Sequence, residues 1–163
     1  MNRERYVRTV AYFKNNQRAN FWLTIIYKIL PNIVFVAYAA LLIYCALYKR
    51  DNIVEITLYP LGVLIFTTIL RVLINEKRPY EIYGVDSVFN KKTKGKSMPS
   101  RHAASTFIIA MAFMSVNLPL GIFMFFLSLL IGASRVLSGA HFIRDVLIGM
   151  AISVEIGWIM LIN

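Results

Sequence analysis

Both histidines of the chain have neighbours that could support phosphoryl transfer. His141 precedes Asp145 by four positions, which makes the two side chains neighbours on one helix face if the segment is helical. A carboxylate that accepts a hydrogen bond from one imidazole nitrogen fixes the tautomer and leaves the lone pair of the other nitrogen free. The pair is therefore a candidate nucleophile with its orienting group, and an ordinary ion pair at a helix start is the alternative.

The second histidine, His102, follows Pro99, Ser100 and Arg101 at the start of a long uncharged stretch. Free backbone N–H groups at a helix N-terminus suit a phosphate group. Pro99 and Ser100 are also ordinary residues at a helix start, so a simple cap is the alternative for them. A cap does not need a histidine, whereas proton donation to a leaving oxygen does need an acid such as His102.

Three arginines, Arg71, Arg78 and Arg135, add positive charge near these histidines in the sequence. Arg71 lies in an apolar run, where a charge that faces lipid costs several kcal/mol, so we expect it to face a polar cavity. Because it is near the end of that run, snorkelling to the membrane surface is the alternative. Arg71 and Arg78 are close to two helical turns apart, so both could face one cavity. Two histidines and one nearby carboxylate form a thin ligand set, so no metal site is expected.

The composition excludes a soluble domain. Hydrophobic residues make up 58% of the 163 residues and charged residues only 16%, which is too little polar surface to cover a globule of one domain. The net charge of +10 fits anionic lipid or a phosphorylated substrate better than nucleic acid, because no soluble basic domain is present to bind it. We therefore expect a phosphorylated lipid and the membrane as partners and no nucleic acid, with the oligomeric state open.

The apolar runs predict about five membrane spans. A helix of roughly 20 residues crosses the hydrocarbon core. The sequence has four apolar runs, over residues 21–48, 53–74, 103–134 and 146–162. The third is long enough for two helices with a hairpin at Asn117. Pro31 interrupts the first run, and the part before it is too short to cross separately. The helix over about residues 103–116 is short, so we expect it to extend back toward the preceding polar segment.

We therefore expect an all-α integral membrane protein, a bundle of about five or six transmembrane helices that forms a single domain over residues 1–163. Residues 1–20 mix basic with apolar side chains, which predicts an amphipathic interfacial helix, and a frayed basic tail is the alternative. Residues 75–101 and 135–145 are separated by two crossings, so both should emerge on one membrane face. Asn52, Asn117 and Asn163 should then lie on the other face.

The ordered motifs carry a resemblance to a known family. Arg71-x6-Arg78-Pro79, Pro99-Ser100-Arg101-His102 and Ser134-Arg135-x5-His141-x3-Asp145 together resemble the type 2 phosphatidic acid phosphatase superfamily of membrane lipid phosphatases. The third motif matches in full. The first usually begins with lysine where this chain has Arg71, and arginine can still bind phosphate bidentately. The second usually has glycine where this chain has Arg101, which could crowd the pocket or add a phosphate contact.

The resemblance implies a role for each motif residue. His141 would attack phosphorus to form a phosphohistidine, Asp145 would orient its ring, and His102 would protonate the departing lipid oxygen. The remaining motif residues would hold the phosphate oxygens: Arg71, Arg78, Ser100, Arg101 and Arg135. Because arginines would supply the positive charge, no metal or other cofactor is expected.

The expected function is metal-independent hydrolysis of a lipid phosphomonoester or diphosphate, with undecaprenyl diphosphate as the leading candidate. Phosphatidylglycerophosphate, phosphatidic acid and a lipid A phosphate are the alternatives. A non-catalytic lipid-binding or transport protein would explain the spans and the basic face, but not the motif spacing. The positive-inside rule would place the site toward the cytoplasm. The basic residues serve phosphate, however, and bacterial members of the family usually act in the outer leaflet, so a cell-membrane protein with an outer-face site is expected.

Overall fold

The computed structural model describes residues 1–48 and 50–162, and within this part it is helical with no strand. The helices are α1 (Arg3–Asn15), α2 (Gln17–Thr24), the π-helical turn η1 (Ile25–Ile29), α3 (Leu30–Tyr48), α4 (Arg50–Ile74), α5 (Pro79–Tyr83), α6 (Arg101–Val116), α7 (Leu118–Leu137) and α8 (Ile143–Ile162). The prediction of an all-α bundle is confirmed.

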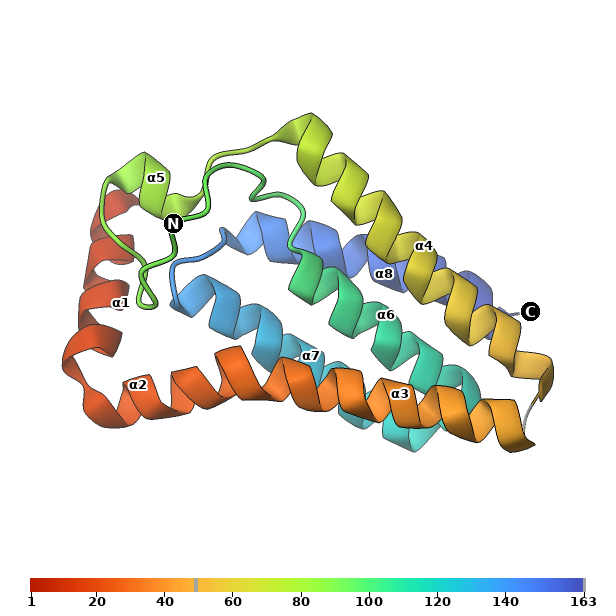
Figure 1. Ribbon diagram of the computed structural model, residues 1–163. Helices are drawn as coiled ribbons and strands as arrows, with labels where there is room; N and C mark the ends of the chain where they lie inside the picture. The colour runs from red at the N-terminus through yellow and green to blue at the C-terminus, as the bar shows by residue number, and fades with distance from the viewer. Residues whose placement is uncertain (49, 163) are drawn as a thin grey trace.

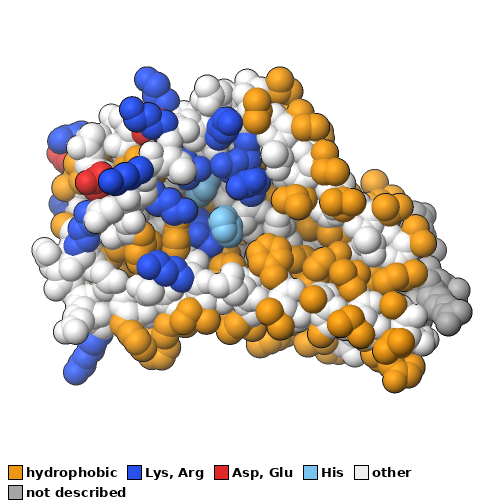
Figure 2. All heavy atoms as spheres, viewed as in Figure 1, with side chains coloured by type: hydrophobic (Ala, Val, Ile, Leu, Met, Phe, Trp, Pro, Cys, Tyr) orange, Lys and Arg blue, Asp and Glu red, His pale blue; other side chains and the backbone are white. Residues whose placement is uncertain are grey.

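Helix α6 forms the centre of the bundle and packs against α3, α4, α7 and α8 (Figure 1). All of its residues from Ala103 to Phe113 are buried. The surrounding helices turn large apolar side chains outward, for example Val36, Leu73 and Trp158, of which 60–74% is exposed. Figure 2 shows such side chains over most of the visible surface away from one basic end. A helix that is buried on all sides inside an apolar exterior is the arrangement expected in a bilayer.

Within the described residues, four helical stretches are long and apolar enough to cross a membrane: Gln17–Tyr48, Ile53–Tyr83, Leu118–Leu137 and Ile143–Ile162. The fifth apolar helix, α6, is shorter and extends back only to Arg101. Because other helices enclose α6, it does not have to match the thickness of the hydrocarbon core by itself. The chain is thus a multi-pass membrane protein with a short central helix.

Pro31 does not divide the first apolar run, since α2, η1 and α3 form one continuous helical stretch. Proline has no N–H, so the carbonyl four residues earlier, on Tyr27, loses its helical donor. The π-helical turn lies directly before Pro31, where Leu30 N–H donates to the Ile25 carbonyl. Arg135 of α7 donates from Nη2 to the Tyr27 oxygen at 2.9 Å. A side chain from another helix therefore replaces the missing backbone donor.

Pro60, inside α4, repeats this arrangement. It deprives the Ile56 carbonyl of its donor. The Tyr38 hydroxyl on α3 donates to that oxygen at 2.6 Å. Both carbonyls left by prolines inside spans are thus satisfied by neighbouring helices, as an apolar environment requires.

Helix α1 lies across one end of the bundle (Figure 1). Tyr6 and Val10 are buried against the polar segment, so the amphipathic helix is formed and its apolar face packs on protein. The Tyr6 hydroxyl donates to the Val85 carbonyl at 3.0 Å, and burial raises the pKa of this phenol, which keeps it a donor. Its ring occupies the space beside Gly139, where a Cβ would lie 2.7 Å from the ring. The N-terminal segment is therefore a packed helix and not a frayed tail.

The polar segment between α4 and α6 meets the α7–α8 loop at the same end of the bundle as α1 (Figure 1). A backbone hydrogen bond from Val88 N–H to the Ser138 carbonyl, 2.9 Å long, joins the two segments directly. The α3–α4 and α6–α7 connections lie at the other end. The two polar segments that the sequence placed together thus lie at one end of the bundle, with Asn52 and Asn117 at the other end, and Asn163 falls outside the described residues.

Candidate active site

His141 lies in the loop between α7 and α8, with Asp145 in the first turn of α8. Nδ1 of His141 is 3.4 Å from Oδ2 of Asp145. The two are therefore not on one helix face as the spacing suggested, because α8 begins only at Ile143. The contact forms because the Asp145 carboxylate turns back over the helix start, where it also accepts a hydrogen bond from Phe142 N–H at 3.0 Å. The carboxylate is thus both a helix cap and the partner of His141.

The other ring nitrogen of His141, Nε2, faces Nη1 of Arg78 at 3.5 Å. With the carboxylate on the Nδ1 side, the geometry assigns the proton to Nδ1 and the free lone pair to Nε2. Burial lowers the pKa of His141 to about 4, against the opposing hydrogen bond from Asp145 and with further lowering by the Arg78 charge. The ring is therefore neutral at neutral pH, and its lone pair points toward a guanidinium group.

Arg71 and Arg78 both lie at this end of the bundle, but not on one helix. Helix α4 ends at Ile74, and Arg78 directly precedes α5, where Glu81 accepts from its backbone N–H at 2.9 Å. Arg71 is buried and donates from Nη1 to the Pro99 carbonyl at 2.8 Å, so it faces the interior and does not snorkel. Arg78 donates from Nε to the Gly95 carbonyl at 3.1 Å, so both guanidinium groups bind the polar segment that leads into α6. Arg71 and Arg78 therefore do not share a helix, as their spacing predicted, although they share the predicted location.

The start of α6 presents free donors. Ser100 is the N-cap residue, yet its hydroxyl makes no capping bond and is buried without a hydrogen-bond partner among the described residues. Its own N–H donates to the Asp145 carbonyl at 2.8 Å, which ties α6 to α8. The helices approach so closely here that a Cβ on Gly149 would lie 2.8 Å from the Ser100 carbonyl oxygen. The unused hydroxyl and the first N–H groups of α6 are available to an anion.

His102 is half-buried and lines a hollow together with Arg101, Ser105, Phe35 and Leu64. The charges that act on its ring include those of Arg135, Lys91 and Arg101, besides His141. Figure 2 shows histidine side chains within a group of Lys and Arg side chains at this end. Arg101 itself is exposed, so it does not fill the site in the way that a crowding residue would. Its side chain lies at the rim of this hollow.

Arg135, in the last turn of α7, is 3% exposed. One nitrogen, Nη2, is bound to the Tyr27 carbonyl, and the guanidinium carbon lies 3.9 Å from the centre of the Tyr27 ring. Its Nε is buried and has no hydrogen-bond partner in the described part of the chain. Arg135 is therefore fixed on one side and has a free donor on another.

Three residues of this region could not be found by motif. Ser97 is fully buried, donates from its hydroxyl to Oδ2 of Asp145, and lies 3.5 Å from Nδ1 of His141. Glu81 accepts from Gly95 N–H as well as from Arg78, which holds the polar segment over the site. Tyr27 contacts Arg135 from a helix far away in the sequence. Serine within a lysine-rich segment carries no signal of its own, and the other two contacts depend on tertiary packing.

The arrangement is suited to attack on phosphorus. A neutral imidazole with one nitrogen held by a carboxylate is a nucleophile, and buried guanidinium groups beside it can stabilise a phosphoryl group in transfer. The free hydroxyl of Ser100 and the free Nε of Arg135 add donors that nothing in the described structure uses.

Comparisons with known proteins agree with this geometry. The family model described as the PAP2 superfamily matches residues 52–163. The fold is similar to that in the crystal structure of Aquifex aeolicus LpxE, with a TM-score of 0.75 and 22% sequence identity over 96% of this chain and 94% of that chain. No curated protein matches. The matched residues are more than half of the sequence and include all three motifs, so the chain belongs to the PAP2 superfamily.

Proposed function

We propose that this PAP2 superfamily member is an integral membrane phosphatase that removes phosphate from a lipid through a phosphohistidine on His141. The observation that carries the proposal is the placement of the two ring nitrogens of His141. Nδ1 meets the Asp145 carboxylate at 3.4 Å, while Nε2 faces the Arg78 guanidinium at 3.5 Å. A phosphate bound by that guanidinium would lie within reach of the Nε2 lone pair.

The reaction would proceed in two displacements. His141 Nε2 attacks the terminal phosphorus and the N–P bond forms. The P–O bond to the leaving group breaks while His102 donates a proton to the leaving oxygen, and the leaving group is the lipid alcohol of a monophosphate or the lipid monophosphate of a diphosphate. Asp145 stabilises the imidazolium that results. Water then attacks phosphorus, His102 takes its proton, and the N–P bond breaks to release inorganic phosphate. The charge on the phosphoryl oxygens would be balanced by the guanidinium groups and the start of α6: Arg71, Arg78, Arg135, Ser100 and the first N–H groups.

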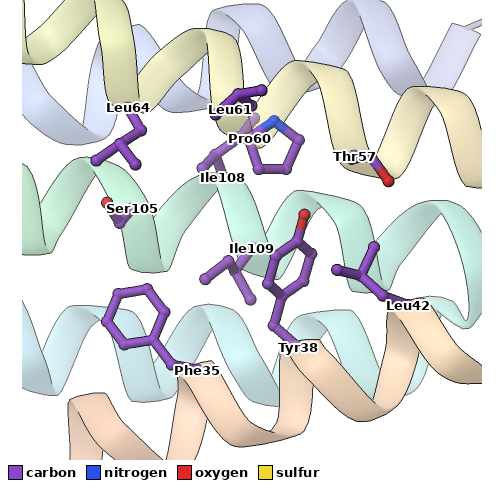
Figure 3. Close-up of a pocket in the computed structure, with 10 residues that line it drawn as sticks. All are labelled: Phe35, Tyr38, Leu42, Thr57, Pro60, Leu61, Leu64, Ser105, Ile108 and Ile109. Carbon is purple, nitrogen blue, oxygen red and sulfur yellow. The ribbon is translucent and has the colours of Figure 1, made fainter.

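An apolar cleft beside the site supports a lipid substrate. Figure 3 shows it between α3, α4 and α6, with Tyr38 and Leu42 on one side, Leu61 on the other and Ile108 at the back. The cleft has a volume of about 260 Å³. It shares Phe35, Leu64 and Ser105 with the hollow at Arg101 and His102, so the two are continuous. A headgroup at His102 would therefore place its hydrocarbon chain in the cleft, whereas a soluble phosphate ester would leave this apolar surface bare.

The charge at the rim favours a diphosphate over a monophosphate. Arg101 is exposed beside His102, and the charge of Lys91 also acts on that ring. The Lys91 Nζ lies 5.6 Å from the centre of the Tyr27 ring, so a second phosphate group bound at this rim would meet two cations. We therefore take undecaprenyl diphosphate as the leading substrate, ahead of phosphatidylglycerophosphate, phosphatidic acid and a lipid A phosphate.

The purified protein in detergent should release phosphate from this panel, fastest from the diphosphate, and vanadate should inhibit it because vanadate mimics the phosphoryl group in transfer. Activity should persist in EDTA, since arginines supply the positive charge.

The R101G variant, which has the usual family residue, should lose more activity on the diphosphate than on the monophosphates, and thus reduce the preference for the diphosphate. Release from no lipid would contradict the proposed function, while an unchanged preference in R101G would contradict only the role of Arg101.

We further propose that the site faces the outside of the cell membrane, in keeping with bacterial members of the family. Lys94 is exposed in the polar segment and lies outside the three motifs. A K94C variant in a C45A background should react with a membrane-impermeant maleimide in intact cells. Labelling that appears only after the cells are opened would place the site toward the cytoplasm instead.

A further inference from the structure

One motif residue, Arg135, is held by the backbone carbonyl of Tyr27, four residues before a proline. In a regular helix the N–H of residue 31 would donate to the Tyr27 carbonyl, but Pro31 has no N–H. Nη2 of Arg135 takes that place at 2.9 Å, from a residue 108 positions away. The π-helical turn directly before Pro31 is part of the same local departure from regular helix geometry.

The ring of Tyr27 fixes the same guanidinium a second time. The guanidinium carbon of Arg135 lies 3.9 Å from the ring centre, which is a close cation–π contact. Tyr27 is 5% exposed, and its ring also packs against Phe89 with 4.5 Å between the centroids. Because packing fixes the Tyr27 side chain, Tyr27 gives Arg135 a hydrogen-bond acceptor through its carbonyl and an aromatic surface through its ring.

These contacts leave the guanidinium in one orientation with a free donor. Nη2 is engaged by Tyr27, whereas Nε is buried and makes no hydrogen bond among the residues described. A buried guanidinium N–H without an acceptor lowers the stability of the fold, unless a bound ligand accepts a hydrogen bond from it. The backbone carbonyl of Arg135 accepts from the His141 N–H at 3.2 Å, so this arginine lies beside the predicted nucleophile.

We infer that Pro31 and Tyr27 are positioning residues for Arg135. The proline keeps the Tyr27 carbonyl open, the carbonyl and ring orient the guanidinium, and the guanidinium offers Nε to the phosphate. The inference rests on the proposed function, because it assigns Arg135 to the phosphate of the substrate. It adds residues from the first span, which carries none of the three motifs, to the machinery of the site.

The P31A variant separates positioning from stability. Alanine supplies an N–H that competes with Arg135 for the Tyr27 carbonyl, and alanine is also the better residue inside a helix. We expect kcat/KM for phosphate release to fall about tenfold or more, since small displacements of such groups are costly, while Tm is unchanged or higher. The matched control is P119A in the first turn of α7, at the opposite end of the bundle, which should retain wild-type kcat/KM. Wild-type kcat/KM in P31A would overturn the inference.

Two conservative changes test the ring, and they apply even if P31A fails to fold. Y27F retains the aromatic surface and should keep near wild-type activity, whereas Y27L removes it and should lower kcat/KM. Equal activities of Y27F and Y27L would overturn the role of the ring.

A double-mutant comparison asks whether Pro31 acts through Arg135. The readout is the rise in Tm that vanadate causes, which needs no turnover. P31A should reduce that rise in the wild-type background and have no further effect in R135A. Independent, additive effects would overturn the inference. A wild-type protein that neither releases phosphate nor responds to vanadate would instead contradict the proposed function, so the two failures are distinguishable.

Discussion

Replacing His141 with glutamine should reduce phosphate release by about 10⁴-fold or more, because a nucleophile that forms a covalent intermediate has no substitute in this site. Glutamine keeps a polar side chain beside Arg78 and Asp145, so the loss should not come from an unpaired buried partner. The measurement is the initial rate of phosphate release from the best lipid of the panel, with Tm as the check on folding.

Rapid quenching with a ³²P-labelled lipid should trap a phosphoenzyme in the wild type that is stable in alkali and labile in acid, as an N–P bond is. H141Q should form none. The matched control is S128A, which removes a buried hydroxyl on α7 that donates to the Met124 carbonyl of the same helix, and which should keep the wild-type rate. H141Q with more than a tenth of the wild-type rate would show that His141 is not the nucleophile.

The D145N variant should lower kcat by about 10³-fold or more, on the scale seen when the carboxylate beside a catalytic histidine is neutralised. The amide of asparagine can donate to Nδ1 of His141, which would move the ring proton to Nε2 and remove the attacking lone pair. The carboxylate also accepts from Ser97 and from Phe142 N–H, so its orientation is well defined in the wild type. S97A, which leaves the carboxylate in place, should lose about tenfold at most.

The pH dependence distinguishes this explanation from a simple change in protonation. Asp145 raises the pKa of His141 against the effect of burial, so D145N should lower it further below about 4. The ring is then neutral above pH 5 in both proteins, and raising the pH cannot restore the nucleophile. Recovery of D145N activity at alkaline pH would mean that Asp145 acts only by setting the charge of the ring.

The sequence predicted which residues of the site come together better than it predicted how. His141 and Asp145 are in contact, yet the helix begins after the histidine, and the carboxylate reaches back to it. Arg71 and Arg78 share one end of the bundle although the helix stops between them. Different local backbone conformations can bring the same motif residues into contact. The spacing of a motif therefore predicts which residues meet, but not the secondary structure that holds them.

The remaining features depend on packing between distant segments. Ser97 enters the site because the polar segment folds over the α7–α8 loop, and Tyr27 meets Arg135 because the first span packs near α7. The apolar face of α1 was predicted from its pattern, but the pattern does not distinguish lipid from protein as the surface that it covers. Hydrophobic periodicity identifies a buried face and not its partner.

The hydroxyl of Tyr38 and the proline at position 60 should constrain each other's replacement, because both act on the Ile56 carbonyl. Loss of the hydroxyl alone would leave the Ile56 carbonyl without a donor inside the membrane, whereas loss of the proline alone would make the hydroxyl dispensable. The proline can therefore be lost before the tyrosine, but the tyrosine cannot be lost before the proline. Lineages of this protein should contain tyrosine without the proline as an intermediate, and proline without a donor at position 38 should be rare.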